Sequence, residues 1–260
     1  MKVQTLSKGL DLLVEKLSTA VATEGNLSPL RAGEIVSAAN ITAEDLAPYA
    51  DFDHPVADCY GRKLVVDNGS FEVMVMSWNP RHYSSIHNHG YTQWGVVQVF
   101  GNTHHMIFHE KDNELRFSRK EILTPGGVVK VNNKFIHQMG NATSDRYMTL
   151  HVYGCNDRDK DVTADAKNYD LEFNRVSRTT GGAFFNLPKE EIYDFQTGPR
   201  PTNEVLLHYS NLVLNYYDRQ PSSVAIQELQ QNILDRIGKQ IFENNKQSGV
   251  TVVNDTFSPS

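Results

Sequence analysis

The 260-residue sequence predicts a mainly β protein, an antiparallel barrel or sandwich with helices on both sides. From about residue 58 to residue 153, short runs rich in Val, Ile, Phe, Tyr and Thr alternate with turns rich in Gly, Asn and Pro. No helical pattern separates these runs, which disfavours a parallel α/β sheet. The regions before and after them carry apolar residues at helical spacing.

The first fifty or so residues predict helices. The first is indicated by leucines that recur at steps of four, three and four, as one helix face requires: Leu6, Leu10, Leu13 and Leu17. Ser28, followed by Pro29, predicts the start of a second helix. Thr42, followed by two acidic residues within three positions, predicts the start of a third.

The strands are expected in runs of β-favouring residues: KLVV (63–66), FEVMVMSW (71–78), WGVVQVF (94–100), HHMIFHE (104–110) and RYMTLHVYG (146–154). The turn signals DNGS, FGNT, TPGG and VNNK lie between these runs. Many short strands joined by tight turns are typical of an antiparallel barrel or sandwich.

After Tyr153 the chain is polar and irregular, and no element is assigned until Asn203. Two amphipathic helices are then predicted, the first by Leu206, Tyr209, Val213 and Tyr216, the second by Ile226, Leu229, Ile233, Ile237 and Ile241. Ser222 or Ser223 is the expected N-cap of the second helix. The valines at 250, 252 and 253 could form an edge strand in an otherwise loose tail. We therefore expect an N-terminal helical segment (1–55), a β-barrel domain (56–200) and a C-terminal helical extension (201–260).

Composition narrows the class of partner. A formal net charge of −6 and a pI near 5.9, with both signs interspersed, argue against a nucleic-acid or anionic-lipid surface. The two cysteines, Cys59 and Cys155, support neither a disulfide framework nor a cysteine-based zinc site. Asp11 and Glu15 interrupt any signal-peptide core, and no apolar run reaches membrane length. A cytoplasmic protein with a small-molecule partner is expected.

Two histidine blocks point to a metal. His87 and His89 flank one residue, so in a strand both imidazoles would face the same side. A second block places His137 four residues before Asn141, downstream of the turn TPGG. These spacings resemble the cupin pattern, which implies a small antiparallel β-barrel with a metal held by His87, His89 and His137. The alternative is that all three are ordinary polar residues.

Trp94 stands five residues after His89, where many cupins carry a glutamate ligand. An indole cannot ligate a metal. Three neutral imidazoles would leave about three positions open on an octahedral ion, which suits chemistry better than structural closure. The remaining histidines of this region lack a partner pattern and are expected to be solvated: His82, His104, His105 and His109.

The flanking sequence, over roughly residues 58–155, resembles cysteine dioxygenase. In that family a Tyr-x-Arg-x-Leu-Val strand, matched here from Tyr60 to Val65, carries an arginine that holds the substrate carboxylate. The resemblance assigns this role to Arg62, with help from Tyr60. A guanidinium suits it, because it forms two parallel charge-assisted hydrogen bonds with a carboxylate.

The family also carries a Ser-x-His-x-Tyr strand beside the metal, matched here by Thr149, His151 and Tyr153. Strand alternation places the three on one face, where they could relay a hydrogen bond that orients the phenol toward bound oxygen. Alternatively, this face could be the solvent side of an edge strand. In animal members a cysteine near the Trp94 position is cross-linked to the matching tyrosine. Here Trp94, or Gly95 if the alignment shifts by one, stands there, so no cross-link can form.

The resemblance implies an Fe(II)-dependent thiol dioxygenase that converts a small thiol carboxylate, such as cysteine, to its sulfinic acid with dioxygen. Trp78 and Met139 are expected to line its pocket, and the C-terminal helices could form a homo-oligomer. One alternative keeps the three-histidine site and changes the substrate to mercaptopropionate, another thiol metabolite, a diketone or a phenol. Another is a non-catalytic cupin that binds a ligand.

Overall fold

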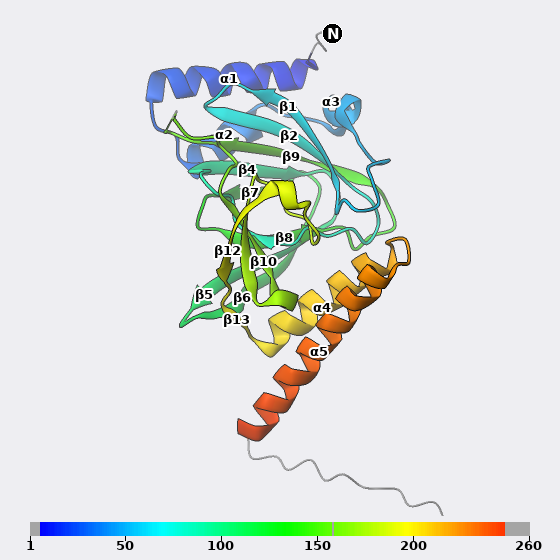
Figure 1. The fold of residues 1–260 in the computed structure, drawn as a ribbon. Coiled ribbons are helices and arrows are strands. Elements are labelled where there is room, and N and C mark those ends of the chain that lie inside the picture. Colours follow the sequence, from blue (N-terminus) through cyan, green and yellow to red (C-terminus); the bar gives the residue numbers. More distant parts are fainter. Residues whose placement is uncertain (1–5, 158, 248–260) are drawn as a thin grey trace, which may run out of the picture.

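The computed structural model describes residues 6–157 and 159–247. Its strands lie in two sheets, with helices at both ends of the molecule (Figure 1). In spatial order, the five-stranded sheet contains β1 (Gly61–Asp67), β2 (Phe71–Trp78), β9 (Tyr147–Gly154), β4 (Trp94–Val99) and β7 (Val128–Val131). The eight-stranded sheet contains β12 (Ile192–Thr197), β11 (Arg175–Thr179), β10 (Ala166–Asp170), β3 (Ile86–His87), β8 (Ile136–Gly140), β5 (Thr103–Lys111), β6 (Glu114–Leu123) and β13 (Arg200–Pro201). The described pairings are antiparallel except that of β13 with β6.

The main hydrophobic core lies between the two sheets. Met74 and Val97 enter it from the five-stranded sheet, and Met106 and Ile136 enter it from the eight-stranded sheet. Strands β1 and β7 end one sheet, and β12 and β13 end the other. The predicted mainly β fold with flanking helices is confirmed, and its strands form two facing sheets rather than one closed barrel.

The N-terminal helices are α1 (Lys8–Glu24), α2 (Pro29–Ala38), α3 (Ala43–Leu46) and the short 3-10 helix η1 (Ala47–Tyr49). Leu10, Leu13 and Leu17 are fully buried, as their spacing predicts. They join a second core on the outer face of the five-stranded sheet. The predicted caps are confirmed, because the hydroxyls of Ser28 and Thr42 accept hydrogen bonds from backbone N–H groups in the first turns of α2 and α3.

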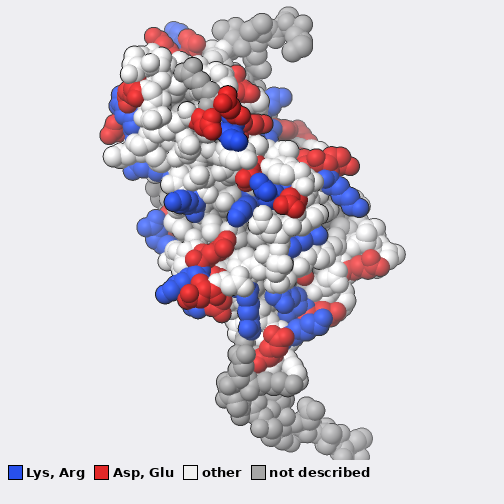
Figure 2. Space-filling model, turned by 60° about the vertical axis from the view of Figure 1, so that its left-hand side comes forward, with Lys and Arg blue, Asp and Glu red and all other residues white. Residues whose placement is uncertain are grey.

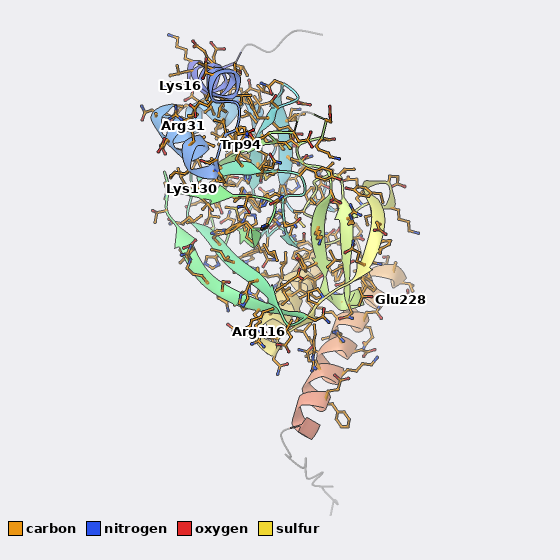
Figure 3. The ribbon with its side chains drawn as sticks, turned by 90° about the vertical axis from the view of Figure 1, so that its left-hand side faces the viewer. Lys16, Arg31, Trp94, Arg116, Lys130 and Glu228 are labelled. Carbon is orange, nitrogen blue, oxygen red and sulfur yellow. The ribbon has the colours of Figure 1, made fainter. Side chains whose placement is uncertain are left out.

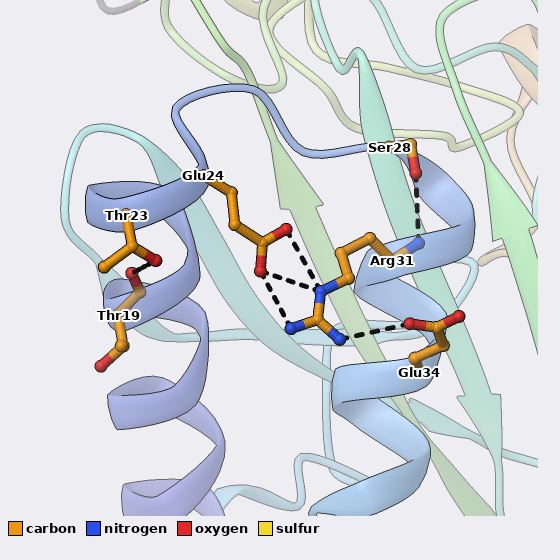
Figure 4. A network of polar contacts seen from close by, with 6 residues as sticks. All are labelled: Thr19, Thr23, Glu24, Ser28, Arg31 and Glu34. Atoms are coloured by element: carbon orange, nitrogen blue, oxygen red, sulfur yellow. Dashed lines mark hydrogen bonds and ion pairs between the residues drawn. The ribbon is translucent and has the colours of Figure 1, made fainter.

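Polar contacts join the end of α1 to α2. The guanidinium of Arg31 on α2 contacts Glu24, the last residue of α1, with Nη2 2.9 Å from Oε1. It also contacts Glu34 one turn further along α2 (Figure 4). These exposed ion pairs contribute little stability, so the packing of the leucines accounts for most of the docking of α1.

The C-terminal region forms α4 (Asn203–Asp218) and α5 (Val224–Gln247). The four predicted apolar residues of α4, from Leu206 to Tyr216, are buried in the main core. Ser223 caps α5, since its hydroxyl accepts from the backbone N–H of Ile226 at 3.2 Å. The possible strand at the valines 250, 252 and 253 lies outside the described residues.

Residues 159–202, which carry no assignment from sequence, supply β10 to β13 and the 3-10 helices η2 (Leu171–Phe173) and η3 (Lys189–Glu191). In β10, Asn168 pairs with His87 of β3. This segment therefore completes the sheet that carries the first histidine block.

The surface carries both charges. Figure 2 shows Lys and Arg interspersed with Asp and Glu over one face, without a large area of a single sign. Among the described helices, none combines the length and apolar character needed to cross a membrane.

Candidate metal centre and active site

His87, His89 and His137 meet in the interior, between the two sheets. His87 ends β3 and pairs with His137 of β8. His89 follows in the loop, where Gly90 adopts a positive φ of 54° and a Cβ would lie 2.0 Å from the Ala164 carbonyl oxygen. The loop, rather than a continued strand, thus turns His89 toward the other two. One ring nitrogen from each of the three histidines lies within 4.8 Å of the corresponding nitrogens of the other two.

The three rings suit a divalent transition metal. Burial lowers the pKa of His87 to about 4 and holds those of His89 and His137 well below the ordinary range. The rings are therefore neutral at pH 7 and offer lone pairs. His89 Nε2 and His137 Nε2 are 3.1 Å apart, the separation of two nitrogens about 2.1 Å from a shared ion and roughly 95° apart. The donor set fits a metal held on one face.

His105 contradicts the expectation of a solvated residue. It is 0% exposed, and its Nε2 lies 2.9 Å from Nδ1 of His137. The sequence gives no sign of this contact, because it depends on the pairing of β5 with β8. Three other histidines of this group make contacts away from the cluster: His82 packs against the His54 ring, His104 bonds Tyr83 and His109 bonds Ser118.

Thr149, His151 and Tyr153 form a continuous chain of hydrogen bonds. Thr149 Oγ1 lies 2.7 Å from His151 Nε2, and His151 Nδ1 lies 2.7 Å from the Tyr153 hydroxyl. Trp78 Nε1 donates to Thr149 Oγ1 at 2.9 Å. Their strand, β9, lies between β2 and β4, and all three residues are buried. The edge-strand alternative is therefore wrong.

One cavity brings the predicted residues together. Its lining includes His87, His89 and His137 together with Tyr60, Arg62, Trp78, Met139, His151 and Tyr153. Arg62, on the edge strand β1, is the one Arg or Lys among these lining residues and is exposed at the rim. Tyr60 is buried; its hydroxyl accepts from the Ala183 N–H and its ring packs on Trp78. The cavity therefore has a histidine cluster inside and a cation at its edge.

Trp94 corrects the sequence interpretation. Its side chain is fully buried in the second core, beneath the N-terminal helices, and Nε1 donates to Asn156 Oδ1 (Figure 3). It does not face the histidines. Gly95 lies against the tyrosine instead, because it pairs with Tyr153 and an added Cβ would lie 3.0 Å from Tyr153 Cδ1. Gly95, not Trp94, fills the place beside the tyrosine.

Sequence reasoning missed Glu72. It shares the inner face of β2 with Met74 and pairs with Tyr153. Its buried carboxylate accepts from the Thr163 hydroxyl. Burial raises its pKa to about 7, although the nearby positive charge of Arg62 acts to lower it. Alternation from Met74 back to Glu72 was the signal that could have found it.

Comparisons with known proteins relate the sequence to one family. A family model described as cysteine dioxygenase type I matches residues 28–156. Cysteine dioxygenase type 1 of Homo sapiens is 29% identical over 113 residues, 41% of this chain and 55% of that protein. The Rattus norvegicus protein of the same name is 26% identical over 159 residues, 59% of this chain and 76% of that protein. The chain spans about half the length of the human protein.

Solved structures give weaker likenesses. An uncharacterised Klebsiella pneumoniae protein with a double-stranded β-helix domain aligns with a TM-score of 0.35 and 13% identity, over 46% of this chain and 92% of that one. A cupin domain from Bordetella pertussis aligns with a TM-score of 0.30 and 15% identity, over 36% and 92%.

Proposed function

This chain is a divergent member of the cysteine dioxygenase type I family, and we propose that it is an Fe(II)-dependent thiol dioxygenase. Its substrate would be a small thiol carboxylate such as cysteine, and its product the sulfinic acid. The thiol R–SH takes up both atoms of O₂ to give R–SO₂H. Sulfur is oxidised by four electrons, and the four electrons reduce dioxygen.

The observation that carries this proposal is the set of residues that line one cavity. Three neutral histidines converge there, His89 and His137 buried and His87 partly exposed, with Arg62 at the rim and the Tyr153 hydroxyl at the end of a hydrogen-bonded chain. His87, His89 and His137 would hold Fe(II), which supplies the redox chemistry that couples a thiolate to dioxygen.

Arg62 would bind the substrate carboxylate. Two observations support this role: Arg62 is exposed to solvent, and it lines the same cavity as the histidines. Tyr60, held beside it by the Ala183 N–H and the Trp78 ring, would complete the contact. A carboxylate fixed at the rim directs the thiol toward the histidines.

Tyr153 would donate a hydrogen bond into the cavity. The Trp78 N–H can only donate, so we assign the chain as Trp78 to Thr149, Thr149 to His151 and His151 to the Tyr153 oxygen. With this direction of donation, the Tyr153 hydroxyl accepts from His151 and keeps its own proton, which it can donate to the substrate or to dioxygen. Burial raises the pKa of Tyr153 and lowers that of His151 to about 3, so both stay neutral at pH 7.

The test is oxygen uptake by the iron-loaded protein. We expect cysteine or mercaptopropionate to drive uptake with stoichiometric sulfinate. An iron-loaded protein that consumes no oxygen with any small thiol contradicts the activity. His87→Ala should lose the metal, and retention of a full equivalent of iron contradicts the proposed ligand set.

The same measurements separate the alternatives. Activity only on a diketone or a phenol, unaffected by Arg62→Ala, would favour a different dioxygenase. Less than about a tenth of an equivalent of any transition metal would favour a ligand-binding protein.

We also propose that residues 56–200 form the catalytic unit, with 1–55 and 201–260 as flanking helical segments. Leu207 on α4 and Leu234 on α5 are half-exposed, which supports self-association through these helices. Sedimentation of the full chain and of its Leu234→Glu variant tests this. A monomer at every concentration contradicts it.

A further inference from the structure

His105 lies behind the histidine cluster, outside the cavity. It is fully buried on β5 and does not line the cavity. Both of its ring nitrogens are engaged: Nε2 lies 2.9 Å from His137 Nδ1, and Nδ1 lies 2.9 Å from Glu121 Oε1. Glu121, His105 and His137 thus form one chain of hydrogen bonds that ends at a predicted metal ligand.

The Glu121 carboxylate determines which atom donates in each hydrogen bond of this chain. Glu121 can only accept when ionised, so the proton of a neutral His105 is on Nδ1. His105 Nε2 is then an acceptor, and His137 must carry its own proton on Nδ1. His137 Nε2 keeps its lone pair, and it is this nitrogen that lies 3.1 Å from His89 Nε2. The charge on Glu121 therefore selects the tautomer of His137 in which Nε2 faces the other ligands.

The surroundings hold the hydrogen-bonded chain in place. Glu121 and His105 are directly opposite each other on β6 and β5. Arg119 forms an ion pair with Glu121, with Nε 2.9 Å from Oε2, and its side chain is largely exposed to solvent. The Phe135 ring packs beside both imidazoles, with centroids 5.9 Å from His105 and 5.2 Å from His137. The hydrogen-bonded chain therefore extends from Arg119 at the surface to His137 in the interior, with Phe135 packed beside it.

We propose that His105 and Glu121 are positioning residues that fix the tautomer and orientation of His137 and so set the metal affinity of the site. This inference rests on the proposed role of His137 as a ligand. Partners behind a metal-bound histidine commonly change metal affinity about 10- to 100-fold, because they hold the ring and increase its basicity. Here the partner is a second histidine, itself oriented by a carboxylate.

Metal affinity and the tautomer of His137 test the proposal without thiol turnover. In His105→Phe, which keeps an aromatic ring and removes both nitrogens, we expect Co(II) and Fe(II) affinity to fall about 10- to 100-fold. His105→Gln should restore part of the loss, because its amide oxygen can accept from His137 Nδ1. His104→Phe, the neighbour that bonds Tyr83 instead, is the matched control and should leave the affinity unchanged.

Glu121→Leu provides a second variant at a partly exposed position, in case His105→Phe does not fold. In the metal-free full-length protein, ¹⁵N shifts should show the His137 proton on Nδ1 in the wild type and a mixture of tautomers in Glu121→Leu. A folded His105→Phe with unchanged affinity overturns the proposal, and so does an unchanged His137 tautomer in Glu121→Leu. A wild type that binds metal but oxidises no thiol contradicts the proposed function and leaves this inference standing.

Discussion

Gly95 of β4 lies directly opposite Tyr153 of β9, with no side chain between its backbone and the phenol ring. A Cβ there would be 3.0 Å from Tyr153 Cδ1 and 2.7 Å from Val131 Cγ2. Gly95→Ala should therefore displace Tyr153, lower the turnover rate and cost about 1–3 kcal/mol of unfolding free energy. Urea unfolding and steady-state oxygen uptake measure the two effects.

The matched control for that substitution is Gly238→Ala. Gly238 lies within α5 with no atom near the place of its added Cβ. Replacing a helical glycine there should raise stability by up to about 1 kcal/mol without changing turnover. Equal effects of the two substitutions would show that the packing around Gly95 has no special role.

Tyr153→Phe should lower kcat about 100-fold and leave iron content unchanged, because it removes a proton donor but no metal ligand. Tyr83→Phe removes a hydroxyl that bonds His104 outside the cavity and should retain wild-type kcat. Metal analysis and oxygen uptake on the same samples give the comparison. Full activity of Tyr153→Phe would rule out the proposed donor.

Arg62→Ala should raise KM for a thiol carboxylate about 10- to 100-fold, because charge-assisted hydrogen bonds are lost. A thiol amine without a carboxylate should be unaffected. Lys63→Ala, at the next position of β1, is the control for loss of one positive charge. An equal change in KM for both substrates would show that Arg62 does not read the carboxylate.

Glu72 should make stability depend on pH near neutrality. Burial raises its pKa from 4.5 to about 7 in the folded protein, so the folded state binds the proton more tightly than the unfolded chain. That contribution is present below pH 4.5 and is lost as pH rises toward 7. Glu72→Gln should therefore be more stable than wild type at pH 8, on the order of 2 kcal/mol, and similar to it near pH 4.

Urea unfolding at both pH values tests this difference. Glu15→Gln, on the exposed face of α1, is the control for loss of one negative charge. A wild type and a Glu72→Gln variant with parallel pH profiles would show that the carboxyl is not protonated on folding.

What could be predicted depends on how local each signal is. The burial of Leu10, Leu13 and Leu17 follows from helical periodicity, and the grouping of His87, His89 and His137 is what the resemblance to the cupin pattern implies. His105 could not be found in this way, because its partners come from strands whose register no local pattern specifies. For residues 159–202, the strand state depends on pairing with β3 and β6. The choice between Trp94 and Gly95 beside the tyrosine could not be made from sequence, because a loop separates His89 from β4 and the alternation of the histidine pair does not continue through it.

The burial of β2, β4 and β9 on both faces has a consequence for the evolution of specificity. One face of these strands meets the main core and the cavity, and the other lies under the N-terminal helices, so all of their residues except the half-buried Met148 are buried. A substitution there disturbs one packed layer or the other. Variation among relatives in substrate choice should therefore concentrate at the rim, at Arg62 on an edge strand and at Thr163 and Gly181 of the late segment. Relatives could then change their substrate by substitutions at the rim while the buried residues beneath it stay the same.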